Sequence, residues 1–216
     1  MEKEIGRNKL DDTQDNSTKE RLRNMFLDLR NAIAGKEELE NIIMENPIYY
    51  LDKNMLFTII PELKVCDGFD HKHPHHCYDV WEHIKLAMQK SKPDLQIRLA
   101  LLLHDIGKPH SYQEDGEVRH FHGHPQVSAS MSQQILARLG YSEKEVEEIC
   151  YLVENHDNII NIDNVNKNNI ELIKKLLHIQ YCDTYAHDPK YIGKRITKLN
   201  EIKEKIDQIQ ESREER

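Results

Sequence analysis

The chain has 216 residues, of which 38% are hydrophobic, and its 38 acidic and 30 basic side chains give a net charge of −8. This excess of acidic side chains argues against a protein that binds the phosphates of duplex nucleic acid, because such proteins present basic surfaces. No run approaches the 18 or so apolar residues of a membrane span, and no apolar signal core opens the chain, so we expect one cytoplasmic domain with extensions and no membrane partner.

The first part of the chain divides into a polar tail and a helical segment. Residues 1–17 have too little apolar surface to offset the entropy of ordering, so we expect a disordered tail there. Ser17 or Thr18 is expected to cap a helix that is interrupted near Gly35 and followed by a second helix, and residues 18–53 would pack beside the main domain. The apolar positions that predict the first helix are Leu22, Met25, Phe26 and Leu29.

Residues 54–188 read as one helix after another, and polar residues occupy positions where apolar ones belong. His83 lies three residues after Val80, and His156 lies three residues after Val153. Side chains three, four or seven apart share one face of a helix, so these imidazoles are expected to point toward the core. Five helical segments show this pattern. The polar residues on their apolar faces are His83, His104, Asp105, His124, His156 and Asp183.

Together these six residues predict a buried metal centre. One buried histidine alone is more often a hydrogen-bonded core residue, but four imidazoles and two carboxylates without partners would cost several kcal/mol each. A shared metal removes that cost, and imidazole with carboxylate suits borderline divalent transition metals. The fold is therefore expected to be all-α, a helical bundle around this centre.

A short hairpin near residues 111–120 is the one expected exception to the helices. Asp115 and Gly116 form a turn signal between two short extended runs. Arg119 follows the turn. It is a candidate contact for a substrate phosphate, although an arginine exposed to solvent is the more common case.

The last segment, residues 189–216, predicts one amphipathic helix. Its apolar residues alternate spacings of three and four amid charged ones, and they are Ile196, Leu199, Ile202, Ile206 and Ile209. Two alternatives are open for this stripe. It packs on the domain, or it pairs with a second copy of the chain to form a homodimer.

Several motifs of the chain are shared with a known family. They are the stretch from His75 to His83, the His-Asp-Ile-Gly-Lys-Pro run that starts at His104, the dipeptide Gly123-His124, and the Glu-Asn-His-Asp run that starts at Glu154. In this set the chain resembles the HD-domain metal-dependent phosphohydrolases, and in particular the HD domain appended to bacterial tRNA nucleotidyltransferases, the CCA-adding enzymes. The resemblance covers residues 54–188.

The resemblance implies a set of metal ligands. In such domains the first histidine, the His-Asp pair and the last aspartate hold one ion, and the matching positions here are His83, His104, Asp105 and Asp183. Members with two further histidines hold a second ion, and the matching positions are His124 and His156, with Asp105 as the bridge. A mononuclear site is the alternative. Nickel, cobalt, manganese, iron and magnesium all suit these ligands.

The resemblance also implies a reaction. It is the cleavage of phosphomonoester or cyclic phosphodiester bonds of a small nucleotide substrate by a metal-activated hydroxide. Hydrolysis of dinucleoside polyphosphates or nucleoside triphosphates is one alternative, and a non-catalytic nucleotide- or RNA-binding module is another. Lys108 is the candidate for stabilising charge on the phosphoryl group, and His76 and His122 are candidates for proton delivery to the leaving group.

The chain departs from the CCA-adding enzymes ahead of the HD motifs. Residues 1–19 contain neither the Gly-Ser loop nor the paired Asp-x-Asp that a nucleotidyltransferase head needs for nucleotide and magnesium. We therefore expect a free-standing HD protein that does not add CCA.

Overall fold

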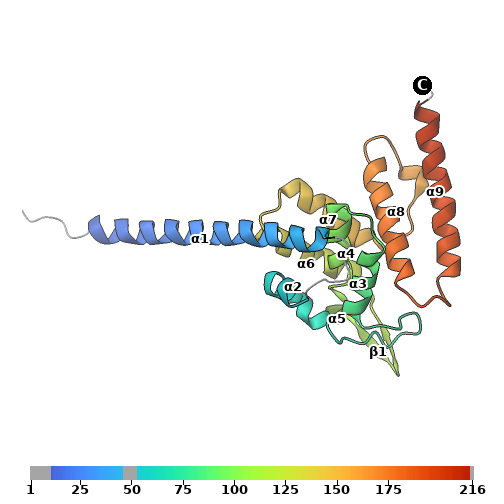
Figure 1. Ribbon diagram of the computed structural model, residues 1–216, viewed down its shortest axis with the longest axis horizontal. Helices are drawn as coiled ribbons and strands as arrows, with labels where there is room; N and C mark the ends of the chain where they lie inside the picture. Colours follow the sequence, from blue (N-terminus) through green and yellow to red (C-terminus); the bar gives the residue numbers. More distant parts are fainter. Residues whose placement is uncertain (1–10, 46–52, 215–216) are drawn as a thin grey trace, which may run out of the picture.

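The computed structural model describes residues 11–45 and 53–214, and within them the chain is almost entirely helical (Figure 1). In chain order the elements are α1 (Asp11–Met44), α2 (Lys53–Ile59), the 3-10 helix η2 (Pro61–Cys66), α3 (Val80–Gln89), α4 (Leu95–Leu103), α5 (Lys108–Ser111), β1 (Gln113–Asp115), β2 (Val118–His120), α6 (His124–Arg138), α7 (Glu143–Asn155), the 3-10 helix η3 (Ile162–Asn164), α8 (Ile170–Tyr185) and α9 (Gly193–Glu214). The predicted all-α fold is confirmed. None of the described helices is long and apolar enough to cross a membrane.

Helix α4 is the centre of the bundle. Every side chain from Ile97 to Leu103 is buried, and the helix lies against α3, α7 and α8. A helix that is covered on all sides has no solvent face, which accounts for its run of leucines. Because α4 ends inside the bundle, the two residues that follow it, His104 and Asp105, are delivered to the interior.

Capping residues set where the surrounding helices begin. The Asp79 carboxylate accepts a hydrogen bond from the Glu82 N–H at 2.8 Å at the start of α3, and Asp94 accepts one from the Ile97 N–H at 3.1 Å at the start of α4. Helix α7 begins with a reciprocal capping box. A shift of one residue along a helix turns a side chain by about 100°, so the register of these helices decides which side chains reach the interior.

The short hairpin is present where the sequence predicts it. Strands β1 and β2 pair antiparallel, with Gln113 opposite His120. Gly116 in the turn has a φ of +62°, a conformation that glycine adopts without steric cost. The Arg119 N–H donates to the Lys72 carbonyl at 3.1 Å, so the hairpin is attached to the loop that precedes α3.

Helix α1 is longer and more continuous than the sequence predicts. It begins at Asp11 rather than at a cap on Ser17 or Thr18, so the segment expected to be a disordered tail is helical from residue 11; residues 1–10 lie outside the described part. The helix also runs through Gly35 without interruption. A glycine inside a helix costs only about 1 kcal/mol. Here a Cβ at Gly35 would meet the Leu139 side chain at 3.4 Å, so close packing on the domain compensates.

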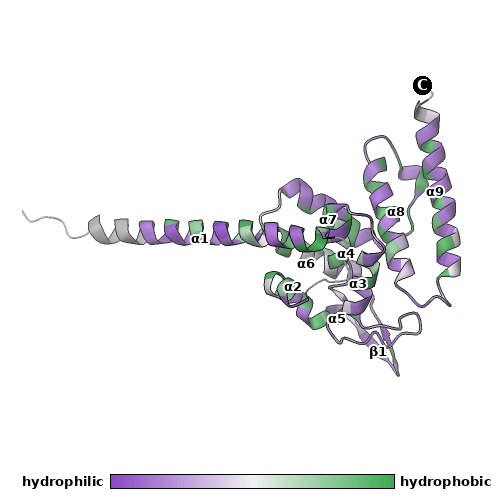
Figure 2. Ribbon diagram, in the orientation of Figure 1, coloured by the Kyte–Doolittle hydropathy of each residue, from purple (hydrophilic) through white to green (hydrophobic). Residues whose placement is uncertain are grey.

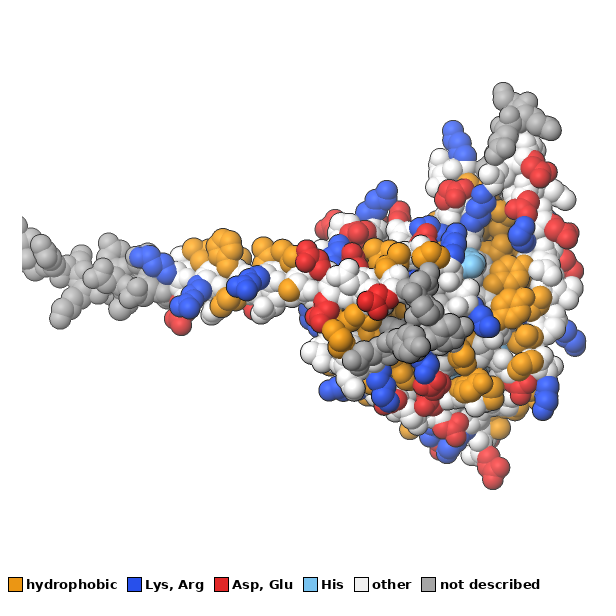
Figure 3. Space-filling view, in the orientation of Figure 1, with side chains coloured by type: hydrophobic (Ala, Val, Ile, Leu, Met, Phe, Trp, Pro, Cys, Tyr) orange, Lys and Arg blue, Asp and Glu red, His pale blue; other side chains and the backbone are white. Residues whose placement is uncertain are grey.

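The two halves of α1 differ in their surroundings. Leu39 and Ile43 are fully buried, and Arg98 Nη1 donates to the Ile43 carbonyl at 2.8 Å, which fastens the end of α1 to α4. The other half projects away from the domain (Figures 1 and 3), and it alternates hydrophilic and hydrophobic bands (Figure 2). Its exposed apolar side chains are Leu22, Met25, Phe26, Leu27, Leu29 and Ile33. The expected packing of the extension beside the domain therefore applies to its second half only.

Helix α9 lies alongside α8 (Figure 1). Leu199, Ile202 and Ile206 on its apolar stripe are buried within the chain. Of the two alternatives for this stripe, the structure favours packing on the domain. A homodimer through this helix stays a prediction.

Candidate metal centre

Six buried side chains meet beyond the end of α4. Each is at most 6% exposed, and they come from five segments that are far apart in the sequence. The segments and residues are α3 (His83), the end of α4 (His104 and Asp105), the start of α6 (His124), the end of α7 (His156) and α8 (Asp183). The set predicted from helical periodicity is thus assembled in one place.

Four of these residues form the first cluster. Asp105 Oδ2 lies 3.3 Å from His83 Nε2 and 3.3 Å from His104 Nε2. Asp183 Oδ1 lies 2.9 Å from His83 Nε2 and 3.6 Å from His104 Nε2. The two nitrogen atoms are 3.3 Å apart. Two imidazole nitrogens and two carboxylate oxygens therefore face one small space.

The second cluster uses the other oxygen of Asp105. This atom, Oδ1, lies 3.3 Å from His124 Nε2 and 3.7 Å from His156 Nε2. The two nitrogens are 3.2 Å apart. One carboxylate thus contributes one oxygen to each cluster, which is the arrangement of a bridging ligand.

Backbone carbonyls orient the four imidazoles. The Nδ1 atoms of His104, His124 and His156 each lie 2.7–2.8 Å from the carbonyl oxygen three residues earlier, in Leu101, Phe121 and Val153. The Nδ1 atom of His83 lies 3.4 Å from the Ala186 carbonyl. A carbonyl only accepts, so these contacts assign the proton to Nδ1 and leave a lone pair on Nε2. That is the tautomer a metal ligand needs, and all four Nε2 atoms face the clusters.

The donor set fits a divalent cation. Both Asp105 oxygens and Asp183 Oδ2 are buried and accept no well-aligned hydrogen bond. Burial opposes protonation of His104, but the Asp105 and Asp183 carboxylates outweigh it and raise the pKa of this imidazole to about 10, so without an ion the ring holds a second proton on Nε2. A metal ion would take the place of that proton between the ring and the carboxylates. A cation would neutralise the carboxylates and accept the nitrogen lone pairs, so these residues fit a metal ion.

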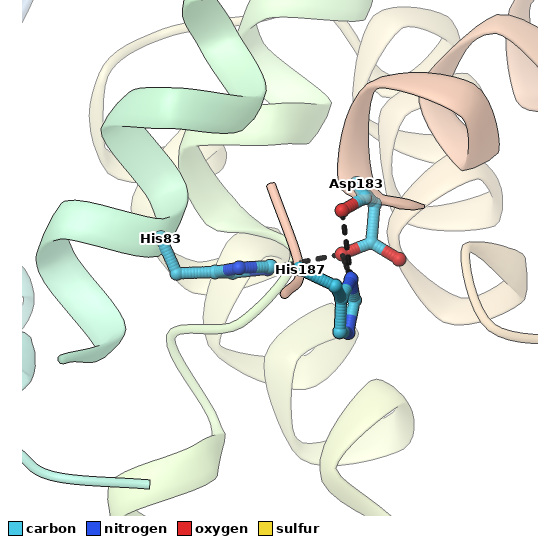
Figure 4. Close-up of side chains that lie close together, drawn as sticks. All are labelled: His83, Asp183 and His187. Atoms are coloured by element: carbon cyan, nitrogen blue, oxygen red, sulfur yellow. Dashed lines mark hydrogen bonds and ion pairs between the residues drawn. The ribbon is translucent and has the colours of Figure 1, made fainter. Parts of the chain in front are cut away.

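Two side chains outside the predicted set lie against the clusters. His187 Nδ1 donates to the Asp183 carbonyl at 2.8 Å and lies 3.8 Å from Asp183 Oδ1, so Asp183 contacts both His83 and His187 (Figure 4). Asp157 Oδ2 lies 3.6 Å from His124 Nε2, beside the second cluster. The sequence carries a signal for both. His187 is four residues after Asp183, and Asp157 adjoins a ligand histidine.

Lys108 is buried at the first cluster rather than solvated. Its Nζ lies 2.7 Å from Asp105 Oδ2 and 3.3 Å from His71 Nε2. His71 Nδ1 donates to the Tyr78 carbonyl at 2.9 Å, and burial, followed by the charge of Lys108, lowers the pKa of His71 to about 2. A neutral His71 can accept a hydrogen bond from the ammonium group. Lys108 thus places a fixed positive charge beside the bridging carboxylate.

The two histidines predicted to deliver protons differ in position. His76 stacks on His71 with ring centroids 3.8 Å apart, and burial, followed by the charge of Lys108, lowers its pKa. The lowered pKa favours the neutral form of His76, which lies in the wall of the cavity beside the clusters, and its role in proton delivery stays a prediction. His122 is exposed at the rim, stacked on His120 at 5.7 Å, and its role stays a prediction.

Arg119 borders the site but is occupied by other contacts. Its Nε donates to Glu114 Oε1 at 2.9 Å and its Nη1 to the Asp70 carbonyl at 2.7 Å. The guanidinium also lies 4.7 Å from the ring centres of Phe69 and Tyr112. These contacts hold the hairpin against the loop before α3. Arg119 also lies in the wall of the cavity, and its contact with a substrate phosphate stays a prediction.

A cavity of about 570 Å³ opens beside both clusters. His124, His156 and Asp183 reach its wall, so a ligand in the cavity would touch the metal centre. The start of α9 forms another part of the wall, with Lys194 and Arg195. Sequence reasoning missed these two cations because nothing in the local pattern indicates that α9 returns to the site.

The fold and the two clusters define a known class of protein. The model of the HD domain family matches residues 75–210, a span that is more than half of the chain and contains all six ligand positions. The chain therefore belongs to the HD domain family, which lies in the superfamily of metal-dependent phosphohydrolases. The match continues past Asp188, where the sequence predicts the end of the domain, and includes most of α9.

Two curated relatives are similar to part of this chain. An A-adding tRNA nucleotidyltransferase from Deinococcus radiodurans is 37% identical over 109 residues, which is 47% of this chain and 25% of the relative. A CC-adding tRNA nucleotidyltransferase from Thermus thermophilus is 31% identical over 133 residues, which is 56% of this chain and 30% of the relative. The similarity thus spans less than a third of the length of either relative.

Proposed function

We propose that this chain is a phosphohydrolase that cleaves phosphomonoester or cyclic phosphodiester bonds of nucleotides and uses two divalent metal ions. The observation that carries the proposal is the position of Asp105, whose two oxygens each lie 3.3 Å from a histidine nitrogen of a different cluster. A carboxylate shared in this way is placed to bridge two metal ions, one in each cluster. Nickel, cobalt, manganese, iron and magnesium are the candidate ions, because the ligands are nitrogen and oxygen atoms.

A small substrate is favoured over a polymer. The cavity of about 570 Å³ has the size of a site for one small molecule. The net charge of −8 works against long-range attraction of a nucleic acid backbone. We therefore propose a mononucleotide or a similar small phosphorylated compound as the substrate.

The chemistry divides between the ions and the chain. Bound ions of this kind neutralise phosphoryl oxygens and make water nucleophilic near neutral pH. The four imidazoles and two carboxylates would hold them, and the backbone contacts at each Nδ1 keep every Nε2 aimed at the site. Lys108 keeps a positive charge 2.7 Å from Asp105 Oδ2 and adds to the field that stabilises a phosphoryl group.

The test is hydrolysis by metal-stripped protein that is resupplied with one metal at a time. The substrate panel comprises 2′,3′-cyclic nucleotides, nucleoside monophosphates, nucleoside triphosphates and diadenosine polyphosphates. We expect metal-restored turnover of a monophosphate or a cyclic nucleotide. His104→Ala, which removes a ligand of the first cluster, should abolish it.

The other outcomes discriminate between the alternatives. Turnover confined to triphosphates or diadenosine polyphosphates would favour the pyrophosphate-cleaving alternative. Metal binding without turnover of any compound would overturn the enzyme proposal and favour a nucleotide- or RNA-binding module. Equal turnover by the wild type and His104→Ala would indicate a contaminating activity.

A further inference from the structure

Arg195, near the start of α9, is anchored between the two clusters. Its Nε donates to Thr184 Oγ1 at 3.2 Å, and Thr184 directly follows the first-cluster ligand Asp183. Its Nη2 donates to the carbonyl oxygen of His156, a second-cluster ligand, at 3.3 Å. One guanidinium group is thus bonded to the side chain of the residue that follows Asp183 and to the backbone of His156.

The contacts of Arg195 leave one nitrogen of its guanidinium group, Nη1, available. Nη2 also lies 3.5 Å from Asp157 Oδ1, so Nε and Nη2 have partners. Within the described part of the chain, no residue accepts a hydrogen bond from Nη1, and Arg195 lines the cavity. Arginine presents its donors in a rigid plane that matches phosphate oxygens. The hydrogen bonds of Nε and Nη2 hold the plane of the guanidinium group in position.

Lys194 adds a second cation to this part of the cavity wall. It is exposed, and no described residue forms a hydrogen bond or ion pair with its ammonium group. The other two cations of the cavity differ in this respect. Lys108 is paired with Asp105, and Arg119 is paired with Glu114.

The loop between α8 and α9 holds this wall in place. The Asp188 N–H donates to the His75 carbonyl at 2.9 Å, and the Tyr191 ring lies 4.6 Å from the His75 ring. The segment that leads into α9 is therefore attached to the loop before α3. Two sets of contacts hold the start of α9 at the cavity: the attachment of the preceding loop and the hydrogen bonds of Arg195.

We propose that Arg195, assisted by Lys194, binds phosphate oxygens of the substrate at the metal centre. The inference rests on the proposed function, since it assigns the phosphate-binding residues of the same cavity. The pair takes the role that the sequence pattern suggests for Arg119. An anion bound beside two metal ions retains oxygens that face the protein, and a cation with free donors is the group that recognises them.

The test is calorimetric titration of inorganic phosphate into the metal-loaded full chain. The variants are Arg195→Gln and Lys194→Ala, and Lys198→Ala is the matched control because it removes a lysine one turn further along α9, outside this cavity. We expect phosphate affinity to fall roughly tenfold or more in Arg195→Gln, as for the loss of a charge-assisted hydrogen bond. A smaller loss is expected in Lys194→Ala and none in Lys198→Ala.

Metal content per chain is measured on the same samples and separates binding from structure. Unchanged phosphate affinity in both Arg195→Gln and Lys194→Ala, or no phosphate binding by the metal-loaded wild type, would overturn the inference. If Arg195→Gln loses metal or fails to fold, the phosphate affinity of Lys194→Ala decides, because Lys194 is exposed and its loss should not disturb the fold. Weakened phosphate binding together with a silent hydrolysis panel would uphold this inference while the proposed activity fails, so the two can be told apart.

Discussion

The Nε2 atoms of His124 and His156 lie 3.2 Å apart, although the Nδ1 atom of each ring already faces a backbone carbonyl. Two lone pairs at this distance repel unless a cation lies between them. We therefore expect His124→Ala to reduce the metal content of the chain from two ions to one. The measurement is elemental analysis after dialysis against metal-free buffer. His110→Ala, which removes an exposed histidine of α5, is the control and should keep both ions. A wild type with one ion would contradict a binuclear centre.

Asp105→Asn should affect both clusters at once. The substitution keeps the shape of the side chain, but one oxygen becomes an NH2 group that repels a cation and donates where acceptance is needed. We expect metal content to fall below one ion per chain and turnover to fall by more than about 100-fold, since even changes around a ligand cost that much. Elemental analysis and steady-state kinetics measure the two effects. Retention of two ions would show that Asp105 does not bridge them.

Gly107→Ala should disturb the second cluster through packing. A Cβ at this position would lie 2.6 Å from the Ser128 nitrogen and 2.8 Å from the His124 carbonyl oxygen, so α6 would have to move. Overpacking of this kind costs about 1–3 kcal/mol. We expect a lower midpoint of thermal unfolding and weaker binding of the second ion. Gly193→Ala is the control because a Cβ there meets no atom within 4 Å. Equal midpoints of thermal unfolding for Gly107→Ala and Gly193→Ala would contradict the close contact between α6 and the backbone at Gly107.

Asp94 should make part of the stability depend on pH. Burial opposes ionisation of this carboxyl group, but the hydrogen bond from the Ile97 N–H and the contact with Lys175 outweigh it and lower the pKa. A carboxyl group with a lowered pKa in the folded state stabilises the protein above its unfolded pKa of about 3.9, and the contribution is lost as the pH falls through the folded value. Asp94→Ala should therefore cost about 1 kcal/mol at neutral pH.

Urea unfolding of the wild type and of Asp94→Ala over a range of pH measures this contribution. The difference in the free energy of unfolding should shrink below about pH 4. Asp115→Ala, in the exposed strand β1, is a control for the loss of a surface carboxylate. A difference that stays constant into the acid range would exclude the ionised cap as its cause.

Leu199→Ala should destabilise the single chain without changing its association. Leu199 is 3% exposed, and truncation of a buried leucine costs about 2–5 kcal/mol. Unfolding curves measure the cost, with the exposed Thr197→Ala as a control on the same helix. Light scattering should give the same mass for both variants and the wild type. A lower mass for Leu199→Ala alone would indicate that the chain forms a homodimer through α9.

The burial of the six candidate ligands could be predicted from the sequence because each belongs to a regular helical pattern. His83 is in register with Val80, and the leucine run of α4 must end at His104 and Asp105. Periodicity fixes the face of a helix on which a side chain lies. A shared polar centre gives all six buried polar side chains a partner, which removes the free-energy cost of burying them. Asp157 and His187 lie just beyond helix ends, where helical periodicity is a weaker guide, although their spacing from His156 and Asp183 is a signal in the sequence.

Other features depend on contacts that the sequence does not encode locally. Arg195 lies 39 positions after His156, and only the return of α9 along α8 brings the two together. The stack of His76 on His71 could not be read from the polar surroundings of His76 in the chain. Gly35 is a helix breaker by propensity, but its close packing on Leu139 overrides that preference.

The origin of the ligands in five separate segments has a consequence for folding. An ion bound only by the assembled clusters contributes its binding free energy to the native state, about 4 kcal/mol when its free concentration exceeds the dissociation constant a thousandfold. The same ion cross-links helices that chain connectivity leaves distant, from α3 to α8. We therefore expect the supply of metal in the surroundings to influence how long this bundle survives heat, denaturant or a protease, whatever reaction it catalyses.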